Sequence, residues 1–494
     1  MVVSGYSTLE SQKKELFFIH TSQTYLYAKE VVMGGILPWP ANRRFFVCLF
    51  VFLFVLEGFA AVSIAANFSK DEVQAILSES TQALLTGQEF SPALAQKQQA
   101  MRELFESGVL KKAELAAMLE KTILPILSQH KTSRYILQTI PPKFDKLLAP
   151  YVEWQEVREL VWRAGSSIIK DGEKFELKIG TLGPSGTPWL NVPETMLIPQ
   201  MAKLSGGKVV IKIFGGGVMG EDTDILRKMD IGQLEGCGCT ALGILAASPE
   251  TSVFLLPGLF KNYDEVDYVT AKFRHQMDKY FEQRGYILAA MIDTGFFNIY
   301  SKNKVTSIAD LKKQKVLTWF GIVETTLFKE LGIDATPVAV PEVVSALSTG
   351  LANTNLAPSA WMLGMQAYQY TNYYIRKPFL YSPAAIIVST SVKERFRKQF
   401  GLSEILADNI VELLVFEVNV LETEWRKQIR AYEEKSLKAF EVKCGMKVVD
   451  LSPEDQQIFD KAAKGVQAKL AGKAFPEGLL NEILKALEEY RAGK

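Results

Sequence analysis

The chain has 494 residues, 48% of them hydrophobic and 22% charged, and it is too long to fold around one compact core. Its 56 Lys and Arg residues nearly balance 55 Asp and Glu residues, so no excess positive charge is available to bind a nucleic-acid backbone. Only 3 His and 4 Cys residues are present, which argues against a His-dependent hydrolase and against a His-rich metal site.

An export signal is predicted near the start of the chain. Arg43 and Arg44 precede the apolar run 45–56, and the small residues 63–65 fit a cleavage site. The run is short for a membrane span, which needs about 20 residues, and an uncleaved anchor is the alternative. We therefore expect residues 1–65 to be an over-extended N-terminus followed by a signal peptide, and the mature protein to lie in the periplasm.

The segment after the signal carries helical patterns and no strand pattern. Ser69 and Glu72 form a capping box at the start of a helix, and residues 112–124 and 153–169 are amphipathic. We therefore expect an all-helical domain over 66–172. Its sequence does not identify a role, and docking or dimerisation is the working hypothesis.

Strands and helices alternate from Glu173 onward. Residues 175–181 and 208–214 carry strand patterns, whereas 194–204 are spaced as a helix despite Pro199. This alternation predicts the α/β fold class, with parallel sheets covered by helices.

One long helix is predicted near the C-terminus. Residues 402–440 keep a helical period of apolar residues without Gly or Pro, and about 38 residues would span about 57 Å. Because that length exceeds one small domain, we expect this helix to cross both lobes of the protein.

A glycine motif and a cysteine pair are interpreted as structural. Gly215–Gly220 matches G-x-G-x-x-G, but the following carboxylates of Glu221, Asp222 and Asp224 lie where a pyrophosphate would bind. The glycines are therefore interpreted as a tight turn between a strand and a helix. Cysteines 237 and 239 are too close in sequence for an easy disulfide, and together with Cys444 they are interpreted as small buried residues.

No catalytic motif is present, so we expect a protein that is not an enzyme. Aromatic and hydroxyl residues instead recur at predicted strand ends, where ligands bind in parallel α/β folds. Each of them alone is more often a core residue, but their recurrence predicts one apolar cleft. The predicted ligand-binding residues are Ser185, Thr187, Trp189, Thr240, Asp293, Phe296, Trp319, Phe320, Pro358 and Trp361.

Over about residues 175–449 the chain resembles the solute-binding proteins of TRAP (tripartite ATP-independent periplasmic) transporters, of the DctP-like kind. The segments that carry the resemblance are LKIGTLGPSGTPW (177–189), KVVIKIFGGGVMGEDTDILRKMDIGQLEG (208–236), LPGLFKNYDEVD (256–267), SIADLKKQKV (307–316), VVSALSTGLANTNLAP (343–358) and YSPAAIIVS (381–389).

The resemblance implies a two-lobed periplasmic-binding-protein fold over 173–494. Lobe 1 would cover about 173–297, lobe 2 about 298–390, and bridging and C-terminal helices 391–494. It also implies a receptor that closes around a small molecule, uses no cofactor, and delivers its ligand to membrane permease subunits.

The expected ligand follows from a departure from the family pattern. Most members place an arginine on the strand after the Asp-Leu-Lys segment, where it pairs with a substrate carboxylate. That position is Leu317 here, and the Asn usual before a later proline is Ala357. Because an unpaired buried carboxylate costs several kcal/mol, we expect a neutral or hydrophobic ligand. Substitution of the missing cation by Arg376 is the alternative.

The resemblance to arginine-lacking receptors of this family also implies a partner protein built of helical repeats. Two other functions stay open. The first is a sensory or scaffold protein that reuses the receptor fold, with residues 66–172 as its interaction module. The second is a nucleotide-dependent enzyme that uses Gly215–Gly220.

Overall fold

The computed structural model describes residues 69–106, 111–140, 154–319 and 321–493. The predicted signal peptide lies outside these residues. Contacts divide the chain into a first compact unit, which includes Phe90–Leu115 and the residues up to Glu79, and a second unit of Ser80–Glu89 and Ala116–Lys494. None of the described helices is both long enough and apolar enough to cross a membrane.

The described chain begins with helices, as predicted. They are α3 (Lys70–Thr86), α4 (Pro92–Glu106), α5 (Lys112–Gln129) and α7 (Trp154–Ser166). The capping box at the start of α3 is confirmed, because the Ser69 N–H donates to the Glu72 carboxylate at 2.7 Å and the Glu72 N–H donates to the Ser69 hydroxyl at 3.2 Å. These bonds satisfy N–H groups that the first helical turn leaves unpaired.

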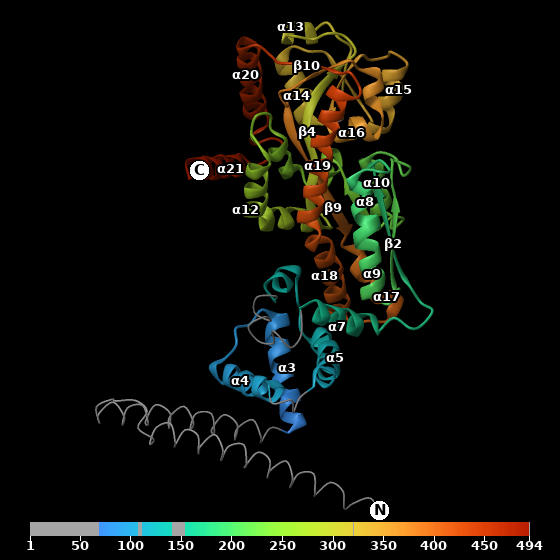
Figure 1. Cartoon of the computed structure of the whole chain (residues 1–494), viewed down its shortest axis with the longest axis vertical. Helices are drawn as coiled ribbons and strands as arrows, with labels where there is room; N and C mark the ends of the chain where they lie inside the picture. The colour runs from blue at the N-terminus through green and yellow to red at the C-terminus, as the bar shows by residue number, and fades with distance from the viewer. Residues whose placement is uncertain (1–68, 107–110, 141–153, 320, 494) are drawn as a thin grey trace, which may run out of the picture. The chain divides into compact units, whose positions relative to one another are not determined.

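A mixed sheet of ten strands organises the second unit (Figure 1). One group of parallel strands forms lobe 1 and comprises β1 (Phe175–Thr181), β2 (Val209–Phe214) and β3 (Gly236–Cys239). A second parallel group forms lobe 2 and comprises β5 (Val316–Trp319), β6 (Ala335–Val338) and β7 (Thr354–Pro358). The sheet order is β2-β1-β3-β9-β4-β7-β5-β6, with β8 (Tyr373–Ile375) and β10 (Lys447–Val449) paired off this path.

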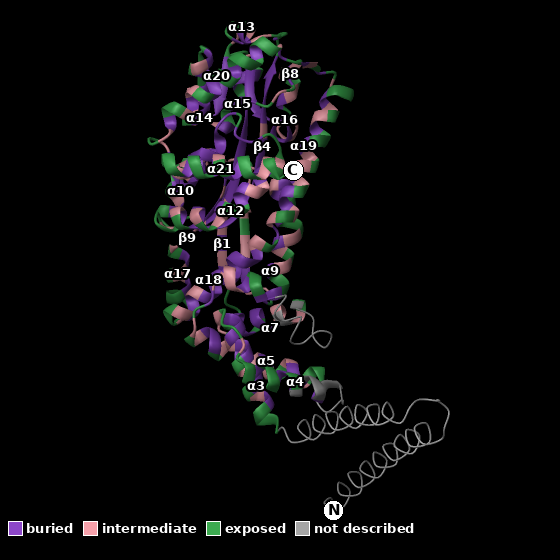
Figure 2. Ribbon diagram, turned by 90° about the vertical axis from the view of Figure 1, so that its left-hand side faces the viewer, coloured by how far each residue is buried: buried purple, intermediate pink, exposed green. Residues whose placement is uncertain are grey.

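Two long antiparallel strands connect the parallel groups. Strand β9 (Leu380–Ser389) pairs with β3, while β4 (Tyr286–Ser301) pairs with both β9 and β7. Nearly every residue of β4 is buried, so this strand runs through the core (Figure 2). The strands that cross between the lobes therefore belong to the interior of both.

The helix predicted around Pro199 is confirmed. Helix α8 (Pro188–Val192) continues through a π-helical turn, Pro193–Leu197, into α9 (Ile198–Leu204). Lobe 1 also contains α10 (Asp222–Asp230), α11 (Ala241–Ala247), a 3-10 turn (Pro249–Leu255) and α12 (Tyr263–Glu282). Lobe 2 contains α13 (Ile308–Leu311), α14 (Ile322–Leu331), the 3-10 turns Val340–Glu342 and Ala367–Tyr370, α15 (Val343–Ser348) and α16 (Ser359–Gly364).

The predicted long helix is interrupted once. Helix α18 (Glu404–Val420) ends and α19 (Glu422–Val442) begins on either side of Leu421, so the prediction of one unbroken helix was wrong. The Leu421 N–H donates to the Val418 carbonyl three residues back, which tightens the turn at that point. The expected crossing of both lobes is confirmed, since α19 contacts α8 of lobe 1 and α16 of lobe 2. The remaining helices are α17 (Ser391–Phe400), α20 (Pro453–Leu470) and α21 (Glu477–Ala492).

Buried polar side chains attach α18 to the preceding helices of the second unit. The Asn409 amide donates to the carbonyls of Leu127 and His130, both at 2.7 Å, and accepts from the Thr132 N–H at 2.9 Å. The Arg134 guanidinium lies 3.2 Å from the Glu412 carboxylate. These contacts satisfy polar groups at the end of α5 and hold one side of α18 in place.

Candidate ligand site

An apolar cavity lies between the sheet of lobe 1 and helices α8, α9 and α18, and it continues to the edge of lobe 2. Protein atoms leave this space unfilled, and part of it is open to solvent. Alternate residues of β1, Leu177, Ile179 and Thr181, line it, because successive side chains of a strand point to opposite faces.

The floor of the cavity is an incompletely packed sheet face. Ile211 and Ile213 of β2 pair with Leu177 and Ile179 of β1, and Ile386 with Val388 extends the same surface on β9. Ile179, Ile211, Ile213, Ile386 and Val388 are only partly buried, although helices cover this face. Protein interiors are normally close-packed, so this exposure means that open space lies above the strands.

Helix α18 supplies the opposite wall. Val411, Leu414, Val415 and Val418 all line the cavity, and their spacing of three and four residues places them on one side of the helix. The Asn409 and Glu412 side chains contact the preceding helices instead. Almost every residue of α18 from Leu406 to Glu417 is buried, as expected for a helix packed between two layers.

Aromatic rings form the end of the cavity nearest lobe 2. The rings of Trp319 (β5) and Trp361 (α16) meet edge to face, with centroids 5.6 Å apart. Trp189 (α8) comes from lobe 1, and its indole N–H donates to the Asp293 carbonyl at 2.9 Å, which fixes the ring. The cavity therefore has walls from both lobes.

Few polar atoms face this space. The hydroxyls of Thr181, Thr240 and Thr294 donate to the Gly238 carbonyl, to Asp222 and to the Pro383 carbonyl, at 2.7, 2.6 and 2.9 Å, respectively. No lining residue among the described part of the chain carries a charge. The surface of the cavity is therefore almost wholly apolar, and its few hydroxyl oxygens are weak acceptors.

One indole group has a hydrogen-bonding capacity that the protein does not use. Trp319 is 4% exposed, and its N–H finds no acceptor among the described residues. A buried unpaired donor is costly, so an acceptor on a ligand would stabilise it.

The structure brings together four of the predicted ligand-binding residues: Trp189, Thr240, Trp319 and Trp361 all line the cavity. The other predicted residues that the structure describes do not line the cavity. Ser185 is exposed, and the buried Thr187 hydroxyl donates to the Pro184 carbonyl at 2.6 Å at the start of α8.

Two more of the predicted residues, Phe296 and Pro358, lie on β4 and β7 and do not line the cavity. Phe296 packs against Tyr263 and Tyr381, with ring centroids 4.9 and 5.5 Å apart. Pro358 is buried at the end of β7, opposite Phe297. Phe320 lies outside the described residues.

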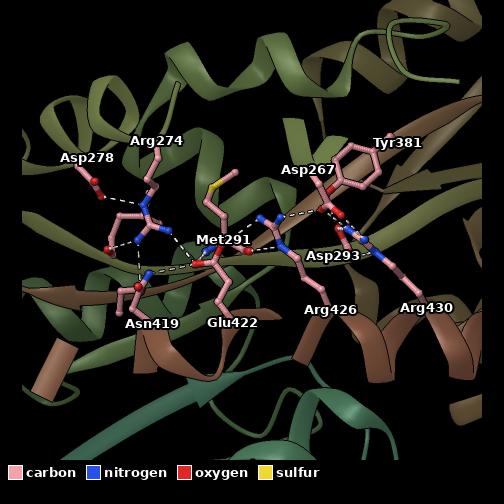
Figure 3. Close-up of polar contacts among 12 residues, drawn as sticks. Asp267, Arg274, Asp278, Met291, Asp293, Tyr381, Asn419, Glu422, Arg426 and Arg430 are labelled. Carbon is pink, nitrogen blue, oxygen red and sulfur yellow. Dashed lines mark hydrogen bonds and ion pairs between the residues drawn. The ribbon is translucent and has the colours of Figure 1, made fainter. Parts of the chain in front are cut away.

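Asp293 is held by the protein itself. Its carboxylate is fully buried and accepts from the Tyr381 hydroxyl and the Arg430 guanidinium, both at 2.7 Å. Figure 3 shows Arg430 of α19 between Asp267 and Asp293, beside Arg426. These carboxylates raise the pKa of Arg430, although its partial burial acts in the opposite direction. Asp293 therefore joins β4 to α19 and does not line the cavity.

Neither the family's arginine position nor its possible substitute supplies a cation to the cavity. Leu317 is 2% exposed on β5, two residues before Trp319. Arg376 is exposed and pairs with Asp450 at 2.9 Å, and it does not line the cavity.

The glycine-rich segment forms the predicted turn. Gly216, Gly217 and Gly220 have φ angles of 64°, 76° and 91°, which side-chain-bearing residues rarely adopt. Glu221 then forms a capping box with Asp224 at the start of α10. Its carboxylate also accepts from the Val340 N–H of lobe 2 at 2.7 Å, so this turn carries a direct contact between the lobes. Burial raises the pKa of Glu221 above its ordinary value.

The interpretation of the cysteines needs correction. Cysteines 237 and 239 are buried, as predicted, but they form a disulfide across a single intervening residue. Their side chains point to the same face of β3 because they are two residues apart, and this brings the sulfurs together. Cys444 is free and only partly buried.

Asp222 supports the adjacent part of the cavity wall. Its carboxylate accepts from the N–H groups of Thr240 and Gly243 at 2.9 and 3.0 Å, which caps α11. Complete burial raises the pKa of Asp222 to about 7. This arrangement positions the Thr240 hydroxyl at the cavity.

The residues that sequence reasoning missed are the aliphatic ones of β1, β2, β9 and α18. They read as ordinary core positions, because the alternation on each strand is the same whether a packed helix or an open space faces it. The sequence signal that could have identified the α18 residues is that 404–420 are apolar on more than one side of the helix.

Comparison with known proteins places this geometry in a family. A family model described as bacterial extracellular solute-binding protein, family 7, matches residues 179–473. A curated solute-binding protein of Verminephrobacter eiseniae is 23% identical over 198 residues, which are 40% of this chain and 59% of that protein.

Solved structures match the fold of about two thirds of the chain. The sugar acid binding protein of Advenella mimigardefordensis in complex with galactonate has 21% identity and a TM-score of 0.56, covering 65% of this chain and 99% of that one. A TRAP periplasmic solute binding protein of Citrobacter koseri with bound D-glucuronate has 21% identity and a TM-score of 0.56, covering 63% and 98%. The predicted two-lobed fold is thereby confirmed.

Proposed function

The chain belongs to bacterial extracellular solute-binding protein family 7, and from that premise we propose that it is the extracytoplasmic receptor of a TRAP-type secondary transporter. The family consists of solute-binding proteins, so the expectation of a protein that is not an enzyme is confirmed. In this proposal the lobes close around a small molecule, and the closed form delivers it to membrane permease subunits.

We propose further that the ligand is neutral and largely hydrophobic. The observation that carries this proposal is the cavity wall, which contains aliphatic and aromatic side chains and no charged one among the described residues. A carboxylate placed there would lose its hydration without gaining a cation, which costs several kcal/mol.

The two solved relatives named above hold galactonate and D-glucuronate, which are acids. At 21% identity, the ligands of these two relatives do not determine the ligand of this chain. Leu317 supports that difference, because an aliphatic side chain stands where the family resemblance leads one to expect an arginine.

Two experiments test the ligand class. The mature chain, beginning at Ala66, is purified without added ligand, and mass spectrometry identifies what denaturation releases. We expect an uncharged molecule that partitions into organic solvent. Titration calorimetry with galactonate and D-glucuronate should then show no binding, and tight binding of either acid would contradict the proposal.

A matched pair of variants connects binding to the cavity. Ile386→Asn adds polar atoms to the partly exposed floor and should weaken binding of the released molecule at least tenfold, while Ile386→Leu should bind nearly as the wild type does. Equal affinity of the two variants would place the ligand elsewhere.

Location and partners belong to the same proposal. Export to the periplasm would follow from the predicted signal over residues 1–65, and a helical-repeat partner protein stays a prediction. Residues 66–172 as a domain of their own likewise stay a prediction, and co-purification with the permease subunits would test whether that segment contributes to docking.

A further inference from the structure

The cavity has a direction, which restricts the shape of its ligand. It runs along β1 from Leu177 to Thr181, four residue steps or about 13 Å of strand, and continues past the carboxyl end of β1 to Trp319 in lobe 2. On the facing wall it follows α18 from Val411 to Val418, about 10 Å of helix. The cavity therefore extends from the cleft between the lobes into the interior of lobe 1.

The chemistry changes along this length. The end deep in lobe 1 is formed by aliphatic residues, among them Ile211, Val388 and Val392, and none of the described residues there has a hydrogen-bonding side chain. The end near the lobe boundary holds the hydroxyls of Thr181 and Thr240. A ligand that fills the whole space needs a hydrocarbon part in lobe 1 and its polar atoms near the cleft.

The polar end also has a specific requirement. The Trp319 N–H is buried without an acceptor among the described residues, whereas the threonine hydroxyls already donate to protein atoms. The surrounding wall holds no described cation to balance a negative charge. An uncharged oxygen acceptor, such as a hydroxyl, ester or carbonyl group, meets these conditions.

We propose that the cavity in lobe 1 binds a single extended hydrocarbon chain whose uncharged oxygen-bearing end lies at the cleft, near Trp319. This inference rests on the proposed function and adds the shape and orientation of the ligand to it. A compact aromatic or cyclic ligand would leave the deep end between β2, β9 and α18 unfilled.

The experiment measures the affinity of the purified mature chain, freed of any bound ligand, for 1-hexanol, 1-octanol, 1-decanol and 1-dodecanol by quenching of tryptophan fluorescence. Each added methylene that enters an apolar cavity should tighten binding about fourfold, until the chain reaches the end of the space. Affinity that does not rise with chain length, or cyclohexanol that binds as tightly as 1-decanol, would overturn the inference.

Two variants test where the hydrocarbon chain of the ligand ends. Ile211→Phe narrows the deep end, so it should reduce the affinity for 1-dodecanol more than tenfold and leave that for 1-hexanol within twofold. Val210→Phe is the matched control, because the neighbouring residue of β2 points to the other face of the sheet and does not line the cavity. If Ile211→Phe does not fold, Val411→Phe on the opposite wall takes its place. Equal loss for long and short alcohols would refute the proposed direction.

The orientation is tested by Trp319→Phe, which removes the unpaired donor and keeps an aromatic ring. We expect about fivefold weaker binding of every alcohol, with the dependence on chain length unchanged. An unchanged affinity would refute the placement of the oxygen at Trp319.

The outcome also separates this inference from the proposed function. If compact apolar compounds bind and chain length has no effect, the inference fails and the apolar receptor stands. If no alcohol binds and galactonate or D-glucuronate does, the proposed ligand class fails together with the inference.

Discussion

The most demanding test of the architecture is the carboxylate of Glu417, on the side of α18 that faces the preceding helices. The side chain is fully buried and bonds to the Arg158 guanidinium, to the Trp162 indole N–H at 2.9 Å and to the Gln200 amide at 2.8 Å. These partners come from α7 and α9. Glu417 therefore joins three helices around the wall of the cavity.

Glu417→Leu keeps a side chain of similar size and removes the acceptor. Arg158 is left with its charge in a site where its side chain is only 11% exposed, and Trp162, which is 1% exposed, loses its partner. Removing one member of a buried ion pair costs about 3–5 kcal/mol, and the contributions of Trp162 and Gln200 overlap with that value because they share one carboxylate. We expect the free energy of unfolding to fall by this amount.

The assay is urea unfolding at pH 7, followed by tryptophan fluorescence. Glu434→Leu on α19 is the control, since its carboxylate is exposed and pairs with the exposed Lys438, and its unfolding midpoint should match the wild type. The double variant Arg158→Met with Glu417→Leu should recover much of the loss, because no unpaired charge remains. A Glu417→Leu midpoint equal to that of Glu434→Leu would refute the reasoning, since it would mean that water reaches this carboxylate.

Three further predictions follow from other buried groups. Burial raises the pKa of Glu324 to about 7, so the folded state holds its proton between about pH 4.5 and 7 where the unfolded state does not, and the free energy of unfolding falls as pH rises through this window. Glu324 thereby changes the free energy of unfolding by about 3 kcal/mol across this window. Glu324→Gln should flatten the dependence of the melting temperature on pH between 5 and 8. An unchanged slope would show that other carboxyl groups produce the pH dependence. Glu221→Ala removes the contact with the Val340 N–H of lobe 2, so small-angle scattering should show a more open unliganded protein, whereas an unchanged radius of gyration would mean that this contact does not hold the lobes. Asp293→Asn breaks the pair with Arg430 and should lower the melting temperature by several degrees without changing which ligand class binds, and a switch of ligand class would return Asp293 to the binding site.

Local signals in the sequence determined much of the fold. The capping box at Ser69, the glycine turn before Glu221 and the helix around Pro199 all appear where the pattern predicts them. Such features depend on residues a few positions apart, whose backbone preferences act within one turn of chain. The order of segments over 175–449 was also enough to identify the family and its two lobes.

Only the tertiary structure decided how distant side chains meet. Asp293 was predicted to end a strand and to bind the ligand, but it lies within β4, and Arg430, 137 residues later, already pairs with it. The cavity is likewise a property of packing, since Ile211 or Val415 has the same pattern in a filled core as beside an open space. Hydrophobic periodicity records which side of an element avoids water, and the distance to the next layer depends on pairings between residues far apart in the chain.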